Sequence, residues 1–205
     1  MRIIEKLSYK SANYFAKQLG LNHQQRTIRY FGFQSLYGDV VKILIMAIVS
    51  LIIKSFLATM LVAFSFAILR RNAGGFHMKT EIGCIIFTTL ICVIPGTIIS
   101  YFQLLSNILT IIILIIIFIF CHICLFKYAP KGSKNNMITD KDEILKFKKK
   151  SITTHRFLYI WVILFLVLNK NYISISISIG CMLEVLTILP IIQNTNRMKK
   201  TIKLY

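Results

Sequence analysis

A histidine and a cysteine, His77 and Cys84, stand seven positions apart in the segment RRNAGGFHMKTEIGC, residues 70–84. An imidazole can accept the proton of a thiol and leave a thiolate, which is the attacking form of cysteine. In one continuous helix the two residues would be about 10.5 Å apart along the axis, too far for a hydrogen bond of roughly 3 Å. The pair can therefore act together only if the chain bends between them.

Glycines in this segment permit such a bend. Gly74, Gly75 and Gly83 tolerate backbone angles that other residues avoid and allow close approach. If a helix begins near Ile82, Cys84 lies in its first turn, where the helix dipole favours a thiolate. These features suit a nucleophilic site, although a packed cysteine and a solvated histidine would explain the same residues.

A metal site is the other chemistry that the segment permits. His77, Glu81 and Cys84 stand at i, i+4 and i+7, and three protein ligands with one water suffice for catalytic zinc. The preceding glycines and the single thiol weigh against zinc, so we expect no metal and no other cofactor. The sequence CHIC at residues 121–124 lies in an apolar run and is interpreted as packing.

Long apolar runs surround this segment. Of the 205 residues, 56% are hydrophobic and only seven are acidic, which is more apolar surface than a soluble domain of this length can cover. The run at residues 108–126 is long enough to cross hydrocarbon as a helix of roughly 20 residues. The sequence therefore predicts an all-α integral membrane protein, and cysteines placed inside apolar runs argue against a disulfide framework.

The charge of the chain indicates its orientation. The net charge is +18, but most basic residues fall in four clusters that alternate with apolar segments. The positive-inside rule assigns such clusters to the cytoplasm, and they also suit anionic headgroups of the lipid bilayer. We therefore expect a multi-pass protein of the cytoplasmic membrane, with both termini and residues 70–84 on the cytoplasmic side, and no nucleic-acid partner.

The apolar blocks divide into about six transmembrane helices in three hairpins. Both flanks of block 40–69 are basic, which requires an even number of crossings, so the block is split near Lys54 into helices 40–53 and 55–69. Block 157–192 is split at NKN, residues 169–171. We therefore predict a single membrane domain, 1–205, whose first part is an interfacial region that starts with an amphipathic helix. Its four parts are the interfacial region 1–39, the catalytic core helices 40–126, the basic cytoplasmic loop 127–156, and the C-terminal hairpin and tail 157–205.

Residues 173–180, ISISISIG, alternate with the period of a β-strand. A strand edge in lipid would leave backbone groups unpaired. We therefore predict a helix whose serines bond back to the preceding turn or to a neighbouring helix.

Residues 70–84 resemble the signature of the accessory gene regulator B (AgrB) family, membrane-embedded cysteine endopeptidases of Gram-positive quorum sensing. The likeness includes the basic pair, the Gly-Gly-x-His core, the six-residue gap before the cysteine, and the position after two apolar helices. YAPKG at residues 128–132 is similar to the family's Tyr-Ala-Pro element, although the KGSKNNM that overlaps its end lacks the acidic residue and second proline often found there. The resemblance extends over essentially the whole chain.

This resemblance implies a reaction. Cys84 would be the nucleophile and His77 the general base, acting on an AgrD-like propeptide with an amphipathic start, a signal segment containing a cysteine, and an acidic tail. Cys84 would cleave the bond after the signal segment and hold it as a thioester. The substrate's own cysteine would then attack this thioester and close a thiolactone, in a site that excludes water.

The resemblance also implies further site residues. Arg70 and Arg71 would bind the acidic region of the propeptide or a carbonyl near the cut, or else only anchor the topology. Lys131 is a second candidate for the acidic tail. Apart from the resemblance, Gln34 precedes the first apolar block and should lie on the same membrane face, where it would orient His77 as the third member of a Cys-His-amide set or else only cap a helix. The candidate site residues are thus Cys84, His77 and Gln34 for catalysis, and Arg70, Arg71, Gly74, Gly75 and Lys131 for substrate binding.

A different class of protein fits the same topology. A non-enzymatic membrane protein that binds or exports a peptide would also have apolar helices and basic loops. Binding of a propeptide without cleavage would distinguish that class from a peptidase. A homodimer is compatible with the resemblance, although no residue of the sequence indicates one.

Overall fold

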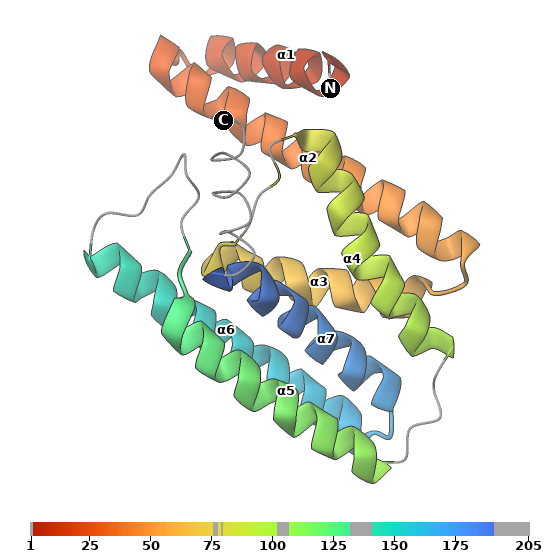
Figure 1. Cartoon of the computed structure of the whole chain (residues 1–205). Helices are drawn as coiled ribbons and strands as arrows, with labels where there is room; N and C mark the ends of the chain where they lie inside the picture. The colour runs from red at the N-terminus through yellow and green to blue at the C-terminus, as the bar shows by residue number, and fades with distance from the viewer. Residues whose placement is uncertain (1, 76–77, 79, 102–106, 132–140, 191–205) are drawn as a thin grey trace, which may run out of the picture. The chain divides into compact units, whose positions relative to one another are not determined.

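The computed structural model describes residues 2–75, 78, 80–101, 107–131 and 141–190 (Figure 1). Within these ranges the chain forms seven helices and no strand. Helices α2 to α7 are each long and apolar enough to cross a membrane. The predicted all-α, multi-pass membrane fold is therefore confirmed for the described residues. The helices are α1 (Arg2–Gln18), α2 (His23–Ile52), α3 (Phe56–Ala73), α4 (Glu81–Tyr101), α5 (Asn107–Tyr128), α6 (Lys141–Val167) and α7 (Asn171–Ile188).

The chain divides into two compact units. The first consists of Met1–Val49 and Met78–Leu90, so it holds α1, most of α2 and the start of α4. The second consists of Ser50–His77 and Ile91–Tyr205, and in it α3, α5, α6 and α7 pack together. Cys84 belongs to the first unit, whereas the two glycines before His77 belong to the second.

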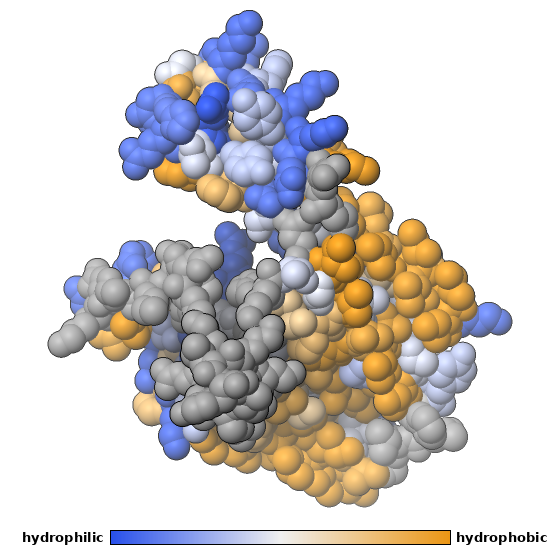
Figure 2. Space-filling view, turned by 45° about the horizontal axis from the view of Figure 1, so that its top comes forward, coloured by the Kyte–Doolittle hydropathy of each residue, from blue (hydrophilic) through white to orange (hydrophobic). Residues whose placement is uncertain are grey.

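The outward surfaces of the helices are apolar, as lipid contact requires. Isoleucines of α5 that are about half exposed or more include Ile108, Ile112, Ile116 and Ile119. Figure 2 shows a broad area of apolar side chains on the visible surface, next to a hydrophilic area. In water such a surface would be unfavourable, but in a bilayer the lipid chains cover it.

Two predicted breaks between helices are confirmed. Lys54 has a positive φ of 59°, and the Ser55 amide donates to the Ser50 carbonyl at 2.9 Å, which ends α2. Asn169 has a φ of 57°, and the Lys170 amide donates to the Phe165 carbonyl at 2.8 Å. These left-handed positions turn the chain between apolar segments.

The start of the first apolar helix is a correction. The sequence analysis predicted that this helix begins at residue 40, but α2 already begins at His23. The Gln25 amide donates to the Asn22 Oδ1 at 2.9 Å, and the Asn22 amide donates to the Gln25 Oε1 at 3.2 Å. This reciprocal pair is a capping box that fixes a helix start well before the apolar residues.

The basic loop 127–156 is a second correction, because α6 begins at Lys141 and makes residues 141–156 helical. Asp142 and Glu143 lie in its first turn, where acidic side chains favour a helix N-terminus. A third difference concerns α3, which continues past residue 69 to Ala73. Arg70 and Arg71 are therefore helical residues with different surroundings, and not part of a loop.

The N-terminal segment forms the predicted helix, α1. The Ser11 and Tyr37 hydroxyls lie 2.7 Å apart, and the Phe15 ring stacks on the Phe33 ring with 5.5 Å between centroids. These contacts pack α1 against α2. The location of α1 at a membrane interface stays a prediction.

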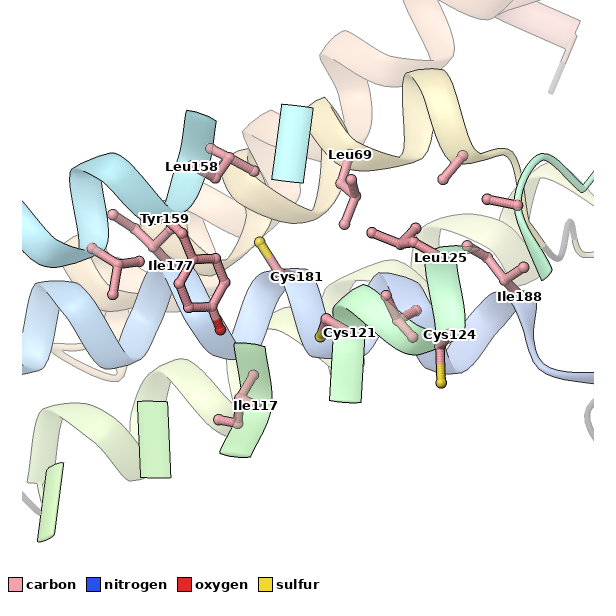
Figure 3. Close-up of a cluster of buried hydrophobic side chains, with 14 of the residues drawn as sticks. Leu69, Ile117, Cys121, Cys124, Leu125, Leu158, Tyr159, Ile177, Cys181 and Ile188 are labelled. Carbon is pink, nitrogen blue, oxygen red and sulfur yellow. The ribbon is translucent and has the colours of Figure 1, made fainter. Parts of the chain in front are cut away.

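Helix α7 lies at the centre of the second unit, where it packs against α3, α5 and α6 (Figures 1 and 3). Cys181 of α7 meets Leu69 of α3 and Leu125 of α5 in one buried apolar cluster. The predicted helix through the alternating serines is confirmed. The Ser176 hydroxyl bonds back to the Tyr172 carbonyl at 2.7 Å, and the Ser174 hydroxyl donates to the Val162 carbonyl of α6 at 2.8 Å.

Candidate active site

Cys84 lies in the first turn of α4, as predicted. The Cys84 amide donates to the Thr80 carbonyl at 3.0 Å, and the Thr80 hydroxyl accepts from the Gly83 amide at 3.1 Å. Thr80 therefore caps the helix. The Cys84 thiol is free and half-buried. A thiolate at this position would lie at the positive end of the α4 dipole.

The other half of the proposed pair, His77, lies outside the described residues, as does the Glu81 side chain. The geometry of His77 with Cys84 therefore stays a prediction, and so does a metal site that would include both. In the part of the chain that the structure describes, no group of three or more His, Cys, Asp and Glu residues is arranged to hold a metal ion.

Gly74 ends α3 and receives the segment that follows α5. Its φ is 76°, and its amide donates to the Arg70 carbonyl at 2.9 Å. Gly74 forms a parallel bridge with Lys131, and the Lys131 amide donates to the Ala73 carbonyl at 2.8 Å. A side chain at position 74 would overlap the Lys131 carbonyl. The structure thus brings together two predicted substrate-binding residues, Gly74 and Lys131.

Gly75 lies against a polar cluster between α3 and α7. Its φ is 141°, and a Cβ built on it would lie 2.6 Å from the Thr187 Oγ1 and 3.2 Å from the Arg70 Nη1. Both the backbone angle and the space require glycine here. Two more of the predicted residues, Arg70 and Gly75, are therefore neighbours.

Arg70 and Arg71 have separate environments. The Arg70 Nη1 lies 3.2 Å from the Glu184 Oε2 and 3.5 Å from the Thr187 Oγ1, and the guanidinium group lies over the Phe66 ring. Arg71 is exposed. The two arginines therefore cannot be treated as one basic pair.

Sequence reasoning missed Glu184. Its side chain is fully buried, and it is the one acidic residue of the apolar helix α7. An ionisable residue within a membrane segment is by default a functional candidate, so the signal was present in CMLEVL, residues 181–186. Its partner could not be predicted, because Arg70 is 114 positions away in the sequence.

Gln34 is half-buried on α2, in the same compact unit as Cys84. A role for it in orienting His77 stays a prediction.

The fold and the capped cysteine define a class, a polytopic α-helical membrane protein with a free thiol at a helix start. The family profile described as "Accessory gene regulator B" matches residues 8–188. The chain belongs to this family. This membership supports a role in accessory gene regulator quorum sensing.

Individual relatives agree with the family assignment. The chain is 30% identical to the accessory gene regulator protein B of Staphylococcus epidermidis over 199 residues, 93% of each chain. It is 31% identical to the protein of that name from Staphylococcus aureus (strain bovine RF122 / ET3-1) over 180 residues, 88% of this chain and 91% of the relative. An AgrB-like protein of Clostridium perfringens (strain 13 / Type A) is 27% identical over 152 residues, 73% and 71% of the two chains. No solved structure matches the chain.

Proposed function

We propose that this protein is a membrane cysteine endopeptidase that removes the acidic tail of an AgrD-like propeptide and promotes closure of a thiolactone. The observation that carries the proposal is Cys84, a free and half-buried thiol in the capped first turn of α4, seven residues after His77. Membership of the AgrB family supports the same reaction.

The first step joins Cys84 to the substrate. His77 accepts the thiol proton, and the Cys84 Sγ attacks the carbonyl carbon at the end of the signal segment. The C–N bond breaks, the tail amine leaves with a proton from His77, and a thioester remains on Cys84.

The second step closes the ring. The thiol of the substrate's own cysteine loses its proton to His77 and attacks the thioester carbon. The bond to the Cys84 Sγ breaks, the new thioester is the thiolactone, and Cys84 regains the proton. One thioester replaces another, so little bond energy changes, whereas attack by water would lose the reactive bond. The site must therefore hold the internal thiol close and keep water out.

Basic side chains on the second unit would hold the propeptide. Arg71 is exposed and Lys131 is half-exposed, so both are available to an acidic tail. The Gly74–Gly75 backbone, free of side chains, suits a substrate strand passing close by. Arg70 already pairs with the buried carboxylate of Glu184, so we expect it to contribute less to substrate binding than Arg71 and Lys131.

The proposed reaction takes place at the cytoplasmic face, with both chain termini on that side. The clustering of basic residues supports this orientation. A membrane-impermeant maleimide added to intact cells is expected to leave Cys84 unlabelled and to label it in inverted vesicles, while Cys84→Ala removes the signal. The other four cysteines are buried, so they contribute little background. Labelling of Cys84 in intact cells would contradict the orientation.

The acyl-enzyme provides the direct test of the proposed function. A propeptide whose ring cysteine is replaced by alanine cannot close the ring, so the thioester on Cys84 should accumulate. Mass spectrometry of the purified protein is expected to show an adduct with the mass of the propeptide without its tail. Neutral hydroxylamine should remove it, and Cys92→Ala should retain it. Tight propeptide binding with neither adduct nor cleavage would instead support a non-enzymatic binding or export protein.

A further inference from the structure

A buried acid on α7 and an arginine on α3 form an ion pair inside the second unit. Glu184 is fully buried and the Arg70 side chain is 19% exposed. Two charges in apolar surroundings are unfavourable alone, and each is tolerated because the other is close. The Nη1 to Oε2 distance of 3.2 Å makes the pair a direct charged hydrogen bond.

The pair bounds the space beside the Cα of Gly75. A Cβ at that position would lie within 3.2 Å of three polar atoms, the Thr187 Oγ1, the Glu184 Oε1 and the Arg70 Nη1. These atoms come from two helices, α3 and α7, which pack closely together. In the part of the chain that the structure describes, the Glu184 Oε1 makes no hydrogen bond. A buried oxygen without a hydrogen bond is unfavourable, so its presence beside Gly75 needs an explanation.

Anchoring of topology does not explain this arrangement. Arg71 follows Arg70 directly and contributes the same charge to the same end of α3, yet it is exposed. Only Arg70 turns inward to an acid. The charge of Arg70 therefore serves a purpose other than orientation, and the residue whose space the pair limits is Gly75, two positions before His77.

We propose that Arg70 and Glu184 are positioning residues that fix the backbone at Gly75, two positions before His77. The inference rests on the proposed function, in which His77 serves as the base. Glu184 thereby becomes necessary for the rate of the reaction, although it belongs to the last described helix and lies outside the signature segment 70–84.

Neutral variants test the pair through the split between kcat and KM. We expect Arg70→Gln and Glu184→Gln each to lower kcat for propeptide cleavage by tenfold or more, and to change KM by less than threefold. Arg71→Gln removes the same charge one residue away, from a side chain proposed to hold the acidic tail, and should act through a higher KM. Ser176→Ala removes a buried hydroxyl of α7 that bonds within its own helix, and its kcat should stay within twofold of the parent.

The double variant Arg70→Gln/Glu184→Gln shows whether the two residues act together. Because the pair is one unit, the double variant should be no slower than the slower single variant. Arg70→Lys, which keeps the charge, should recover part of the kcat that Arg70→Gln loses. Rates are measured well below the melting temperature of each variant, at equal amounts of folded protein, so that a loss of stability alone does not lower kcat.

Two results would overturn the inference. The inference is wrong if the Gln variants keep the kcat of the parent, or if the double variant loses the product of the two single losses. In both cases a parent protein that forms the acyl-enzyme still supports the proposed function. A folded parent that forms no acyl-enzyme would overturn the proposed function and this inference together.

Discussion

Replacement of Cys84 by alanine is expected to abolish release of the propeptide's acidic tail. The proposed reaction has a single nucleophile, and the alanine side chain cannot form the thioester through which both steps pass. Loss of such a group lowers a rate by roughly 10³-fold or more. Co-expression with a propeptide that carries an epitope on its tail, followed by detection of the freed tail, measures the effect. His77→Ala should fail in the same way, because the thiol then lacks its base.

Other cysteines of the chain supply matched controls for Cys84. Cys92 and Cys121 are fully buried and Cys124 is nearly so, so alanine at these positions removes a sulfur from the interior without touching the proposed site. These variants should still release the tail. Tail release by Cys84→Ala itself would contradict the assignment of the nucleophile. Loss of activity with a chelator, together with resistance to thiol alkylation, would support the metal site instead.

Replacement of Gly180 by alanine is expected to destabilise the second unit. Gly180 lies where α7 meets α3, and a Cβ there would overlap the Ser65 hydroxyl and the Val62 carbonyl. The carbonyl belongs to the backbone, so α3 and α7 must separate to admit the methyl group. Overpacking of this kind costs about 1–3 kcal/mol, which corresponds to a melting temperature lower by roughly 2–12 °C for a chain of this size.

Gly38 of α2 is the matched control for Gly180. Nothing lies within 4 Å of a Cβ built on it, so Gly38→Ala should leave the melting temperature unchanged or raise it. Alanine is better than glycine in a helix by about 1 kcal/mol when there is space for the methyl group. Equal melting temperatures for the two variants would show that α3 and α7 are not in close contact at Gly180. The same separation would pull Glu184 away from Arg70, so Gly180→Ala should also slow cleavage.

The sequence predicted where the apolar segments lie better than where the helices begin. Hydropathy reports the part of a helix that lipid surrounds, so it identified the breaks near Lys54 and Asn169 but not the start of α2 at His23. That start depends on the side-chain amides of Asn22 and Gln25. Such signals are visible in the sequence only when polar segments are searched for caps as carefully as apolar segments are searched for spans.

Some features of the candidate site could be predicted from local sequence, and others could not. The spacing from His77 to Cys84 and the first turn of α4 follow from local sequence, and the structure confirms that Cys84 lies in this turn. The environment of Gly75 does not follow from local sequence, because Glu184 and Thr187, which form part of it, are more than 100 positions away. Long-range pairs of this kind depend on how helices pack, which no local pattern reveals.

The central position of α7 has a consequence for how the protein is made. The ribosome synthesises α3, α5 and α6 first, so the helices that surround α7 enter the membrane before their common partner exists. During that interval the ion pair between Arg70 and Glu184 cannot form, and α7 does not yet cover the part of α3 that Gly180 later packs against. The packing of α3, α5 and α6 against α7 can therefore form only after α7 has been synthesised and inserted.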